Sequence, residues 1–171
     1  SDARYDAVDH VMTYIFSDVA GLKEFVDLGN SLRESGRMPA LLPSVERAVY
    51  RLDGIAAAPR IKAGADVLPW WPAKGVYILI EQGAASAAEL ADAPGVGGAW
   101  WGGGQPTQSS YGATPNAGLQ LTYCFLDGEP IEAAKQLRPA LEKRWARSGL
   151  KPLLAAPFHV FDPYQLDRFL P

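Results

Sequence analysis

The chain has 171 residues, of which 48% are hydrophobic and 20% are charged, and its formal net charge is -3. This length and hydrophobic content are sufficient for a folded core and exclude a largely disordered chain. The negative net charge and the lack of a lysine and arginine cluster disfavour nucleic acid as a partner.

A single cysteine, Cys124, excludes an internal disulfide, and no cysteine and histidine spacing indicates a metal site. No metal and no cofactor are therefore expected. No apolar run approaches the ~20 residues that a membrane-spanning helix needs, and the first residues lack the basic-then-apolar pattern of a signal peptide. We expect a cytoplasmic protein with no membrane partner.

Residues 8–16, "VDHVMTYIF", are rich in β-branched and aromatic side chains that alternate with period two, which predicts a strand. Asp18 can cap a helix over about residues 20–35, where apolar side chains recur at helical spacing. Residues 44–54, "SVERAVYRLDG", alternate again and predict a second strand. Residues 1–56 are therefore expected to form a partial βαβ unit.

Residues 57–74 are rich in proline and glycine and are expected to form a linker that presents Trp70 and Trp71. The apolar segment "GVYILIEQG" that follows predicts a strand. In "SAAELADAP", Ser86 and Glu89 have the spacing of a capping box, which predicts a short helix.

The stretch "PGVGGAWWGGG", residues 94–104, fails the spacing of both glycine-rich nucleotide motifs, GxGxxG and GxxxxGK[ST]. It aligns with "PSVERAVY" at residues 43–50 through shared proline, valine and alanine, which predicts a turn followed by a strand. On a strand, Trp100 and Trp101 point to opposite faces of the sheet.

Beyond this strand, the polar residues 105–118 predict an irregular exposed loop, and "LQLTYCFLDG" predicts another strand. Residues 130–149 predict an amphipathic helix with Pro130 in its first turn and Gly149 at its end. Pro139 is expected to kink this helix or divide it. The predicted apolar stripe comprises Ile131, Ala134, Leu137, Leu141 and Trp145. The segment "LKPLLAAPFHVFDP" predicts the last strand, and "YQLDRFLP" a final turn.

The order of these elements predicts an α+β fold in which residues 75–171 form a ferredoxin-like βαββαβ unit with an antiparallel sheet. Both helices would cover one face of that sheet. The other face needs a second sheet, supplied by the first 60 residues or by another chain, so we expect a homodimer.

The turn and strand elements "PSVERAVYRLDG" and "PGVGGAWWGGG", each preceded by a strand and a helix, resemble the dimeric α+β barrel superfamily and in particular its EthD-like members. The resemblance covers residues 75–162 as a full unit and 8–56 as a partial one. It implies a ligand cavity between the sheet and its helices or inside the barrel. Members include cofactor-free monooxygenases, isomerases, cyclases and decarboxylases, some heme enzymes, and proteins without known activity.

Three side chains are candidates for proton transfer. His10 and His159 are the two histidines of the chain, and histidine titrates near neutral pH. Glu81 shares a strand face with Tyr77 and would serve as a base if that face lines a cavity. The alternative to these roles is structural. A strand histidine is more often a half-buried side chain whose hydrogen bonds are satisfied within the protein, and Glu81 is more simply a solvated residue at a strand end. Cys124 is expected to be a buried structural thiol, because no basic neighbour in sequence would activate it.

The sequence thus favours a protein that binds a small hydrophobic or aromatic metabolite, with cofactor-independent proton transfer or oxygenation as its candidate chemistry. The alternative is a non-catalytic dimerisation or partner-binding module in which the aromatic pairs form an interface. A heme protein is a third reading with little support from a single strand histidine. The residues expected to shape the ligand pocket are Tyr14, Tyr77, Trp71 and Trp100.

Overall fold

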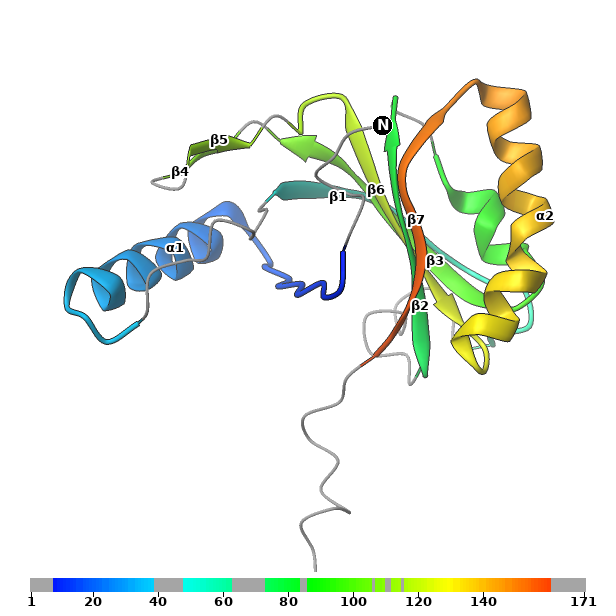
Figure 1. Cartoon of the computed structure of the whole chain (residues 1–171), viewed down its shortest axis with the longest axis horizontal. Coiled ribbons are helices and arrows are strands. Elements are labelled where there is room, and N and C mark those ends of the chain that lie inside the picture. The colour runs from blue at the N-terminus through cyan, green and yellow to red at the C-terminus, as the bar shows by residue number, and fades with distance from the viewer. Residues whose placement is uncertain are drawn as a thin grey trace, which may run out of the picture. The chain divides into compact units, whose positions relative to one another are not determined.

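The computed structural model describes residues 8–38, 48–62, 73–83, 86–105, 107–109, 112–114 and 116–160. The elements are, in chain order, α1 (Val19–Glu34), β1 (Val49–Ala57), β2 (Gly75–Gln82), the 3-10 helix η3 (Ala88–Asp92), β3 (Val96–Gln105), β4 (Thr107–Ser109), β5 (Gly112–Thr114), β6 (Leu119–Leu126), α2 (Pro130–Ser148) and β7 (Lys151–His159) (Figure 1). The predicted α+β class is confirmed. No helix in these described ranges is long and apolar enough to cross a membrane.

The chain divides into two compact units. Unit 1 comprises Ser1–Val49 and Gln105–Ala117, and unit 2 comprises Tyr50–Gly104 and Gly118–Pro171. Unit 2 therefore contains most of β1, a strand expected to belong with the first 56 residues. The linker residues 63–72 and the tail from residue 161 lie outside the described residues, so Trp70, Trp71 and the predicted final turn do too.

The main sheet has five strands in the order β1-β3-β6-β2-β7. β2 pairs antiparallel with both β6 and β7, and β3 pairs antiparallel with β6. β7 is an edge strand, which suits its two prolines, Pro152 and Pro157, because proline cannot donate a hydrogen bond to a neighbouring strand. Strands are confirmed within three predicted segments: β2 within 75–83, β6 within 119–128 and β7 within 150–163, of which residues 161–163 lie outside the described residues.

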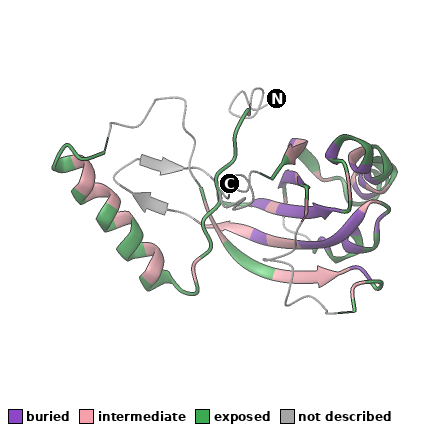
Figure 2. Cartoon of the chain, turned by 90° about the horizontal axis from the view of Figure 1, so that it is seen from below, coloured by how far each residue is buried: buried purple, intermediate pink, exposed green. Residues whose placement is uncertain are grey.

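The core lies on one face of this sheet, where α2 and η3 pack. In the register, Tyr77 stands opposite Cys124 and Leu79 opposite Thr122, so these side chains share that face. Figure 2 shows the buried residues concentrated in the central strands and in the elements that cover them. The core cluster consists of Leu79, Ala87, Leu90, Ala91, Ala93, Val96, Ala99, Cys124, Leu126, Ala133, Leu137 and Leu141.

The tryptophan pair of β3 divides between the two faces of the sheet, as predicted. Trp101 packs against the core cluster, whereas Trp100 stacks on Tyr123 of β6 with ring centroids 4.2 Å apart. The glycines around the pair allow close approach of backbone. A methyl group at Gly102 would overlap the carbonyl of Arg51 in the neighbouring strand β1, so only glycine fits there.

A tight turn leads into β3. Gly95 has φ +80° and the Val96 amide donates to the Ala93 carbonyl, which is the geometry of a type II turn with Pro94 in its first central position. The turn predicted from the proline and glycine pair is confirmed. The capping box before it is wrong: the Ser86 hydroxyl accepts from the amide of Ala88, and the Glu89 carboxylate turns away to bind Arg144.

Helix α2 is one uninterrupted helix of 19 residues, although a division or kink was predicted at Pro139. Pro139 is exposed, and the helix begins at Pro130 and ends on Gly149, which adopts the left-handed conformation as expected. The predicted apolar stripe is shifted around the helix, since Ile131 is 51% exposed. The buried residues of α2 are Pro130, Ala133, Leu137, Leu141 and Arg144.

In unit 1, the strand predicted over residues 8–16 does not form: all nine residues are described and none is in a helix or strand. The helix predicted after it is confirmed as α1, and the Asp18 carboxylate caps it by accepting from the Gly21 amide at 2.8 Å. No residue of α1 is buried. The polar loop 105–118 differs from expectation too, because β4 and β5 form a short antiparallel pair within it.

Candidate functional site

A buried ion pair joins the end of β2 to α2. Glu81 and Arg144 are 0% and 3% exposed in their side chains, and Arg144 Nη2 lies 2.9 Å from Glu81 Oε2. Arg144 Nε also donates to both carboxylate oxygens, and the indole Nε1 of Trp145 donates to Glu81 Oε1 at 2.7 Å. The three donors hold the carboxylate in place and orient the Trp145 ring.

The remaining terminal nitrogen of Arg144 also has hydrogen-bond acceptors. Its Nη1 donates to the Ser86 carbonyl at 2.8 Å and to Glu89 Oε1 at 2.5 Å. Burial lowers the pKa of Arg144, but hydrogen bonds and charges from Glu81 and Glu89 outweigh that effect and raise the pKa overall. Arg144 thus remains a cation inside the core.

Glu81 is therefore neither solvated nor open to a substrate. Its placement on the face of Tyr77 and Leu79 agrees with the strand pattern, but its partners were missed. One signal pointed to them: Arg144 lies three residues after Leu141 and seven after Leu137, on the face of α2 that packs on the sheet. An arginine at such a position requires a buried acid.

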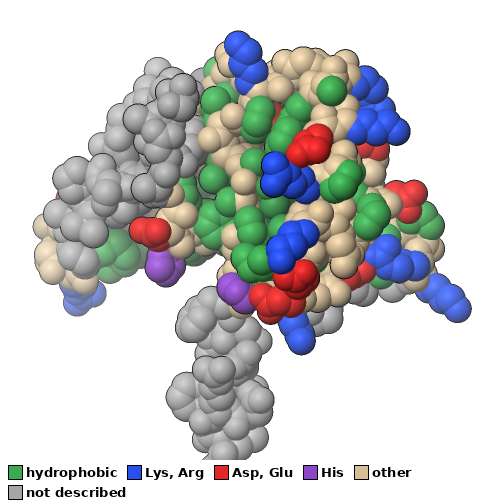
Figure 3. All heavy atoms as spheres, turned by 45° about the vertical axis from the view of Figure 1, so that its right-hand side comes forward, with side chains coloured by type: hydrophobic (Ala, Val, Ile, Leu, Met, Phe, Trp, Pro, Cys, Tyr) green, Lys and Arg blue, Asp and Glu red, His purple; other side chains and the backbone are tan. Residues whose placement is uncertain are grey.

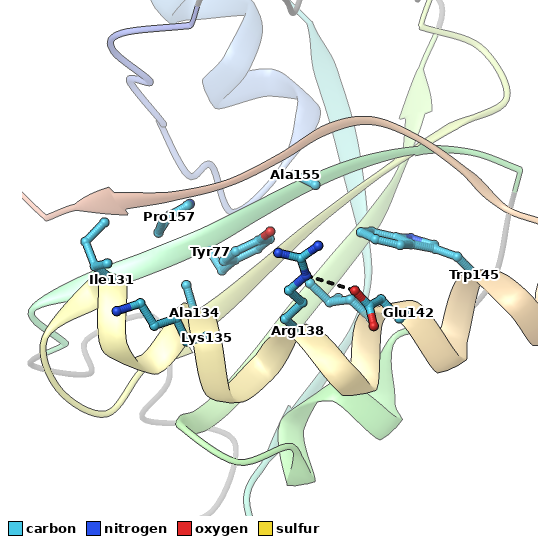
Figure 4. A pocket seen from close by; sticks show the side chains of 10 residues that line it. Tyr77, Ile131, Ala134, Lys135, Arg138, Glu142, Trp145, Ala155 and Pro157 are labelled. Carbon is cyan, nitrogen blue, oxygen red and sulfur yellow. Dashed lines mark hydrogen bonds and ion pairs between the residues drawn. The ribbon is translucent and has the colours of Figure 1, made fainter.

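An open groove runs between α2 and the β2–β7 edge of the sheet, with a volume of about 420 Å³. Figure 4 shows Tyr77 and Arg138 meeting in its middle, with Ile131 toward one end and Trp145 toward the other. β7 contributes Ala155 and Pro157 to the opposite wall. The full lining is Tyr77, Ile131, Ala134, Lys135, Arg138, Leu141, Glu142, Trp145, Ala155 and Pro157. These residues come from three elements of unit 2.

Tyr77 supplies a polar group at the floor of this groove. Burial, followed by the nearby Cys124, raises the pKa of its hydroxyl, while the charge of Arg138 acts in the opposite direction. The hydroxyl is consequently protonated at neutral pH and can donate a hydrogen bond. Among the described residues it has no hydrogen-bond partner, and Figure 4 shows it pointing toward the Arg138 guanidinium.

Three charged side chains stand on the α2 side of the groove. Arg138 Nε binds Glu142 Oε1 at 2.8 Å, and Lys135 Nζ binds Glu132 Oε1 at 2.6 Å. Two of the charged lining residues are basic and one is acidic. In Figure 3, basic and acidic side chains stand among hydrophobic ones on the face drawn there. The groove is thus an apolar channel whose α2 rim carries two basic side chains, each paired with a glutamate.

The two histidines belong to different units of the chain. His10 is exposed in the irregular segment 8–16 of unit 1. His159 ends β7 in unit 2, 70% exposed, with its Nε2 3.8 Å from Glu129 Oε1. Neither lines the groove, and neither contacts Glu81 in any described interaction. Within unit 2, the described interactions thus do not join His159 to Glu81.

Of the four residues expected to shape a pocket, Tyr77 lines the groove. Trp100 lies on the opposite face of the sheet, stacked on Tyr123. Tyr14 is 55% exposed in unit 1, with its ring centroid 4.7 Å from that of Phe25. Trp71 lies outside the described residues. The groove residues that the sequence did not indicate are Lys135, Arg138, Glu142, Ala155 and Pro157, because they gather only when α2 packs beside β7.

Cys124 is fully buried on the helix face, and burial raises the pKa of its thiol to about 12. It is a protonated core side chain, as expected for a structural thiol. Within the described part of the chain, no three His, Cys, Asp or Glu side chains gather as a metal site would require.

The chain matches no protein-family model, no curated protein and no solved structure.

Proposed function

We propose that the protein binds a small hydrophobic or aromatic molecule in the groove between α2 and the β2–β7 edge. The observation that carries this proposal is the lining: apolar walls from Leu141, Trp145 and Pro157 flank the hydroxyl of Tyr77, a hydrogen-bond donor supplied by the sheet. The volume of about 420 Å³ falls within the usual range for small-molecule sites. Such sites combine apolar walls with a few polar groups that orient the ligand.

Trp145 makes the groove a preorganised surface. Its indole nitrogen is held by Glu81 Oε1 at 2.7 Å, so the ring keeps one orientation while lining the groove. A fixed aromatic surface costs little ordering entropy when a flat ligand packs on it. Because Tyr77 is protonated and no histidine is among the lining residues, the groove supports binding more directly than general-base catalysis.

Filling the groove should abolish binding. In Ala134→Phe the added ring projects from a position that lines the groove, whereas Ala146→Phe places the same ring at an exposed position of α2 outside it. We expect naphthalene-based probes, 2-naphthamide and 2-naphthoate, to shift the NMR signal of the Trp145 indole N–H in the parent chain and in Ala146→Phe. Ala134→Phe should show no shift.

The indole signal is assigned by its disappearance in Trp145→Phe. Failure of both probes to bind the parent chain, or equal binding by Ala134→Phe, would contradict the proposal. Retained circular dichroism of each variant checks that the fold is intact.

We propose a ferredoxin-like arrangement for β2, η3, β3, β6, α2 and β7, in keeping with the dimeric α+β barrel resemblance. The strand order supports this: β6 lies between β2 and β3, which η3 connects, and β2 lies between β6 and β7, which α2 connects. Two interleaved split βαβ units have this pattern. The EthD-like relationship remains a prediction from the turn and strand motifs.

A second candidate function, homodimerisation, has separate support in unit 1. Most of the exposed large hydrophobic side chains of the described residues fall within residues 8–38, and α1 has no buried residue. An apolar surface of this kind commonly marks a protein interface. The side chains concerned are Val11, Met12, Tyr14, Ile15, Val19, Phe25, Leu28 and Met38.

If this surface binds a second copy, light scattering after size exclusion should give about twice the chain mass of 18.4 kDa. Leu28→Glu, at a position 58% exposed, should shift the dissociation constant upward by one to two orders of magnitude, since a charge would have to be desolvated. Ile131→Glu, at a similarly exposed position of α2, is the control. A monomeric parent chain would contradict this candidate.

A further inference from the structure

We propose that the ligand of the groove carries a carboxylate, which Arg138 and the Tyr77 hydroxyl bind while the apolar part of the ligand packs along Trp145. This inference rests on the proposed function and names the chemical class of the ligand. A flat aromatic monocarboxylate fits the arrangement.

The Arg138 guanidinium has hydrogen-bond donors that the described structure does not use. Its Nε is engaged by Glu142 Oε1 at 2.8 Å, and its two terminal nitrogens have no hydrogen-bond partner in the described part of the chain. Those nitrogens form the fork that binds the two oxygens of a carboxylate. Glu142 therefore holds the guanidinium at the groove and leaves its binding edge open.

Tyr77 completes the site from the sheet. Its protonated hydroxyl points toward the same guanidinium, so a carboxylate at Arg138 can accept from both residues (Figure 4). A negatively charged oxygen is a better acceptor for these donors than a neutral one. The Tyr77 hydroxyl would also gain the partner that it lacks among the described residues.

Arg138 is the cation of the lining that stands nearest to Tyr77 (Figure 4). Lys135 lies one helical turn before Arg138 and pairs with Glu132 at 2.6 Å, as Arg138 pairs with Glu142. Because the two cations and the two acids balance, the preference for a carboxylate comes from the open terminal nitrogens of Arg138 and not from a net charge. A cationic or neutral ligand would leave those two nitrogens without an anionic acceptor.

The walls require that the rest of the ligand be apolar. Trp145 is fixed at one end through Glu81, and Ala155 and Pro157 of β7 face α2 across the groove. A polar sugar or peptide would lose hydrogen bonds to water against these walls without replacement. The cation at Arg138 together with the apolar walls around it thus fits a ligand that has a carboxylate at one end and an apolar body.

The test compares 2-naphthoate with its neutral isostere 2-naphthamide at pH 7 and low salt, by calorimetric titration of the parent chain. We expect 2-naphthoate to bind at least about ten-fold more tightly, the range for a hydrogen bond to a charged group. Arg138→Gln should remove this preference and leave 2-naphthamide binding unchanged, and Tyr77→Phe should reduce it by a smaller factor. Arg147→Gln, an exposed arginine of α2 outside the groove, should retain it.

The outcomes separate the two proposals. If neither probe binds, the proposed function itself fails. If both bind with equal affinity, binding in the groove stands and the carboxylate assignment is overturned. A preference for 2-naphthoate that persists in Arg138→Gln also overturns the assignment, since another cation would then be responsible.

Discussion

Replacing Glu81 with glutamine is expected to lower the free energy of unfolding by about 3–5 kcal/mol, the usual cost of breaking a buried ion pair. The substitution keeps the size of the side chain but leaves the charge of Arg144, 3% exposed, without its principal partner. Glu89 remains bound to Arg144, so the lower end of that range is expected. Urea unfolding followed by circular dichroism measures the change.

The control is Glu142→Gln, which breaks the exposed pair with Arg138, whose side chains are 77% and 58% exposed. It should cost less than about 1 kcal/mol, since water and salt screen such pairs. The double variant Glu81→Leu/Arg144→Met removes both buried charges and should be less destabilised than Glu81→Gln. A double variant of equal or lower stability would show that charge burial is not the cause.

Replacing Gly95 with alanine is expected to destabilise the chain by about 2–5 kcal/mol, as two costs act together. Its φ of +80° disfavours any residue with a side chain. In addition, a methyl group there would lie 2.9 Å from the Ala133 carbonyl oxygen in the first turns of α2. The helix backbone cannot yield as the end of a flexible side chain can.

Gly118→Ala separates these two costs. Gly118 has φ +78°, close to that of Gly95, but nothing lies within 4 Å of an added methyl group. It should therefore cost only the backbone term, about 1–2 kcal/mol. Equal urea midpoints for the two variants would refute the close approach of β3 to α2 at Gly95.

The strand predicted over residues 8–16 was wrong, because the sequence of a segment does not show whether a neighbouring strand will pair with it. Residues 8–16 have the alternation of a strand, but a strand forms only where a neighbour supplies its hydrogen bonds. Residues 8–16 are not assigned to any strand of the described structure. Their exposed apolar side chains, such as Met12 and Ile15, are also the feature that supports homodimerisation.

Predictions from local sequence patterns were wrong where a residue distant in sequence bound or packed against the same side chain. Ser86 and Glu89 have the spacing of a capping box, yet Glu89 binds Arg144, a neighbour 55 residues along the chain. The ion pair is charge-assisted and so outweighs the weaker cap. Likewise, the stripe predicted on α2 began with Ile131, whereas packing on the sheet selected Ala133 and Arg144 for burial.

By itself, the sequence determined the elements whose signals are local: the strands at 75–82, 96–105, 119–126 and 151–159, and the helices capped by Asp18 and ended by Gly149. Alternation, helical periodicity and turn residues act between near neighbours, so they can be read along the chain. It also placed Trp100 and Trp101 on opposite faces of β3.

Only the tertiary structure decided which of those faces holds the groove and which partners satisfy Glu81. Tyr77, Arg138 and Pro157 are far apart in sequence and meet because α2 packs across β2 beside the edge strand β7. Long-range packing of this kind depends on the summed burial of many side chains. The groove is therefore a property of the assembled sheet and helix, and no local sequence motif predicts it.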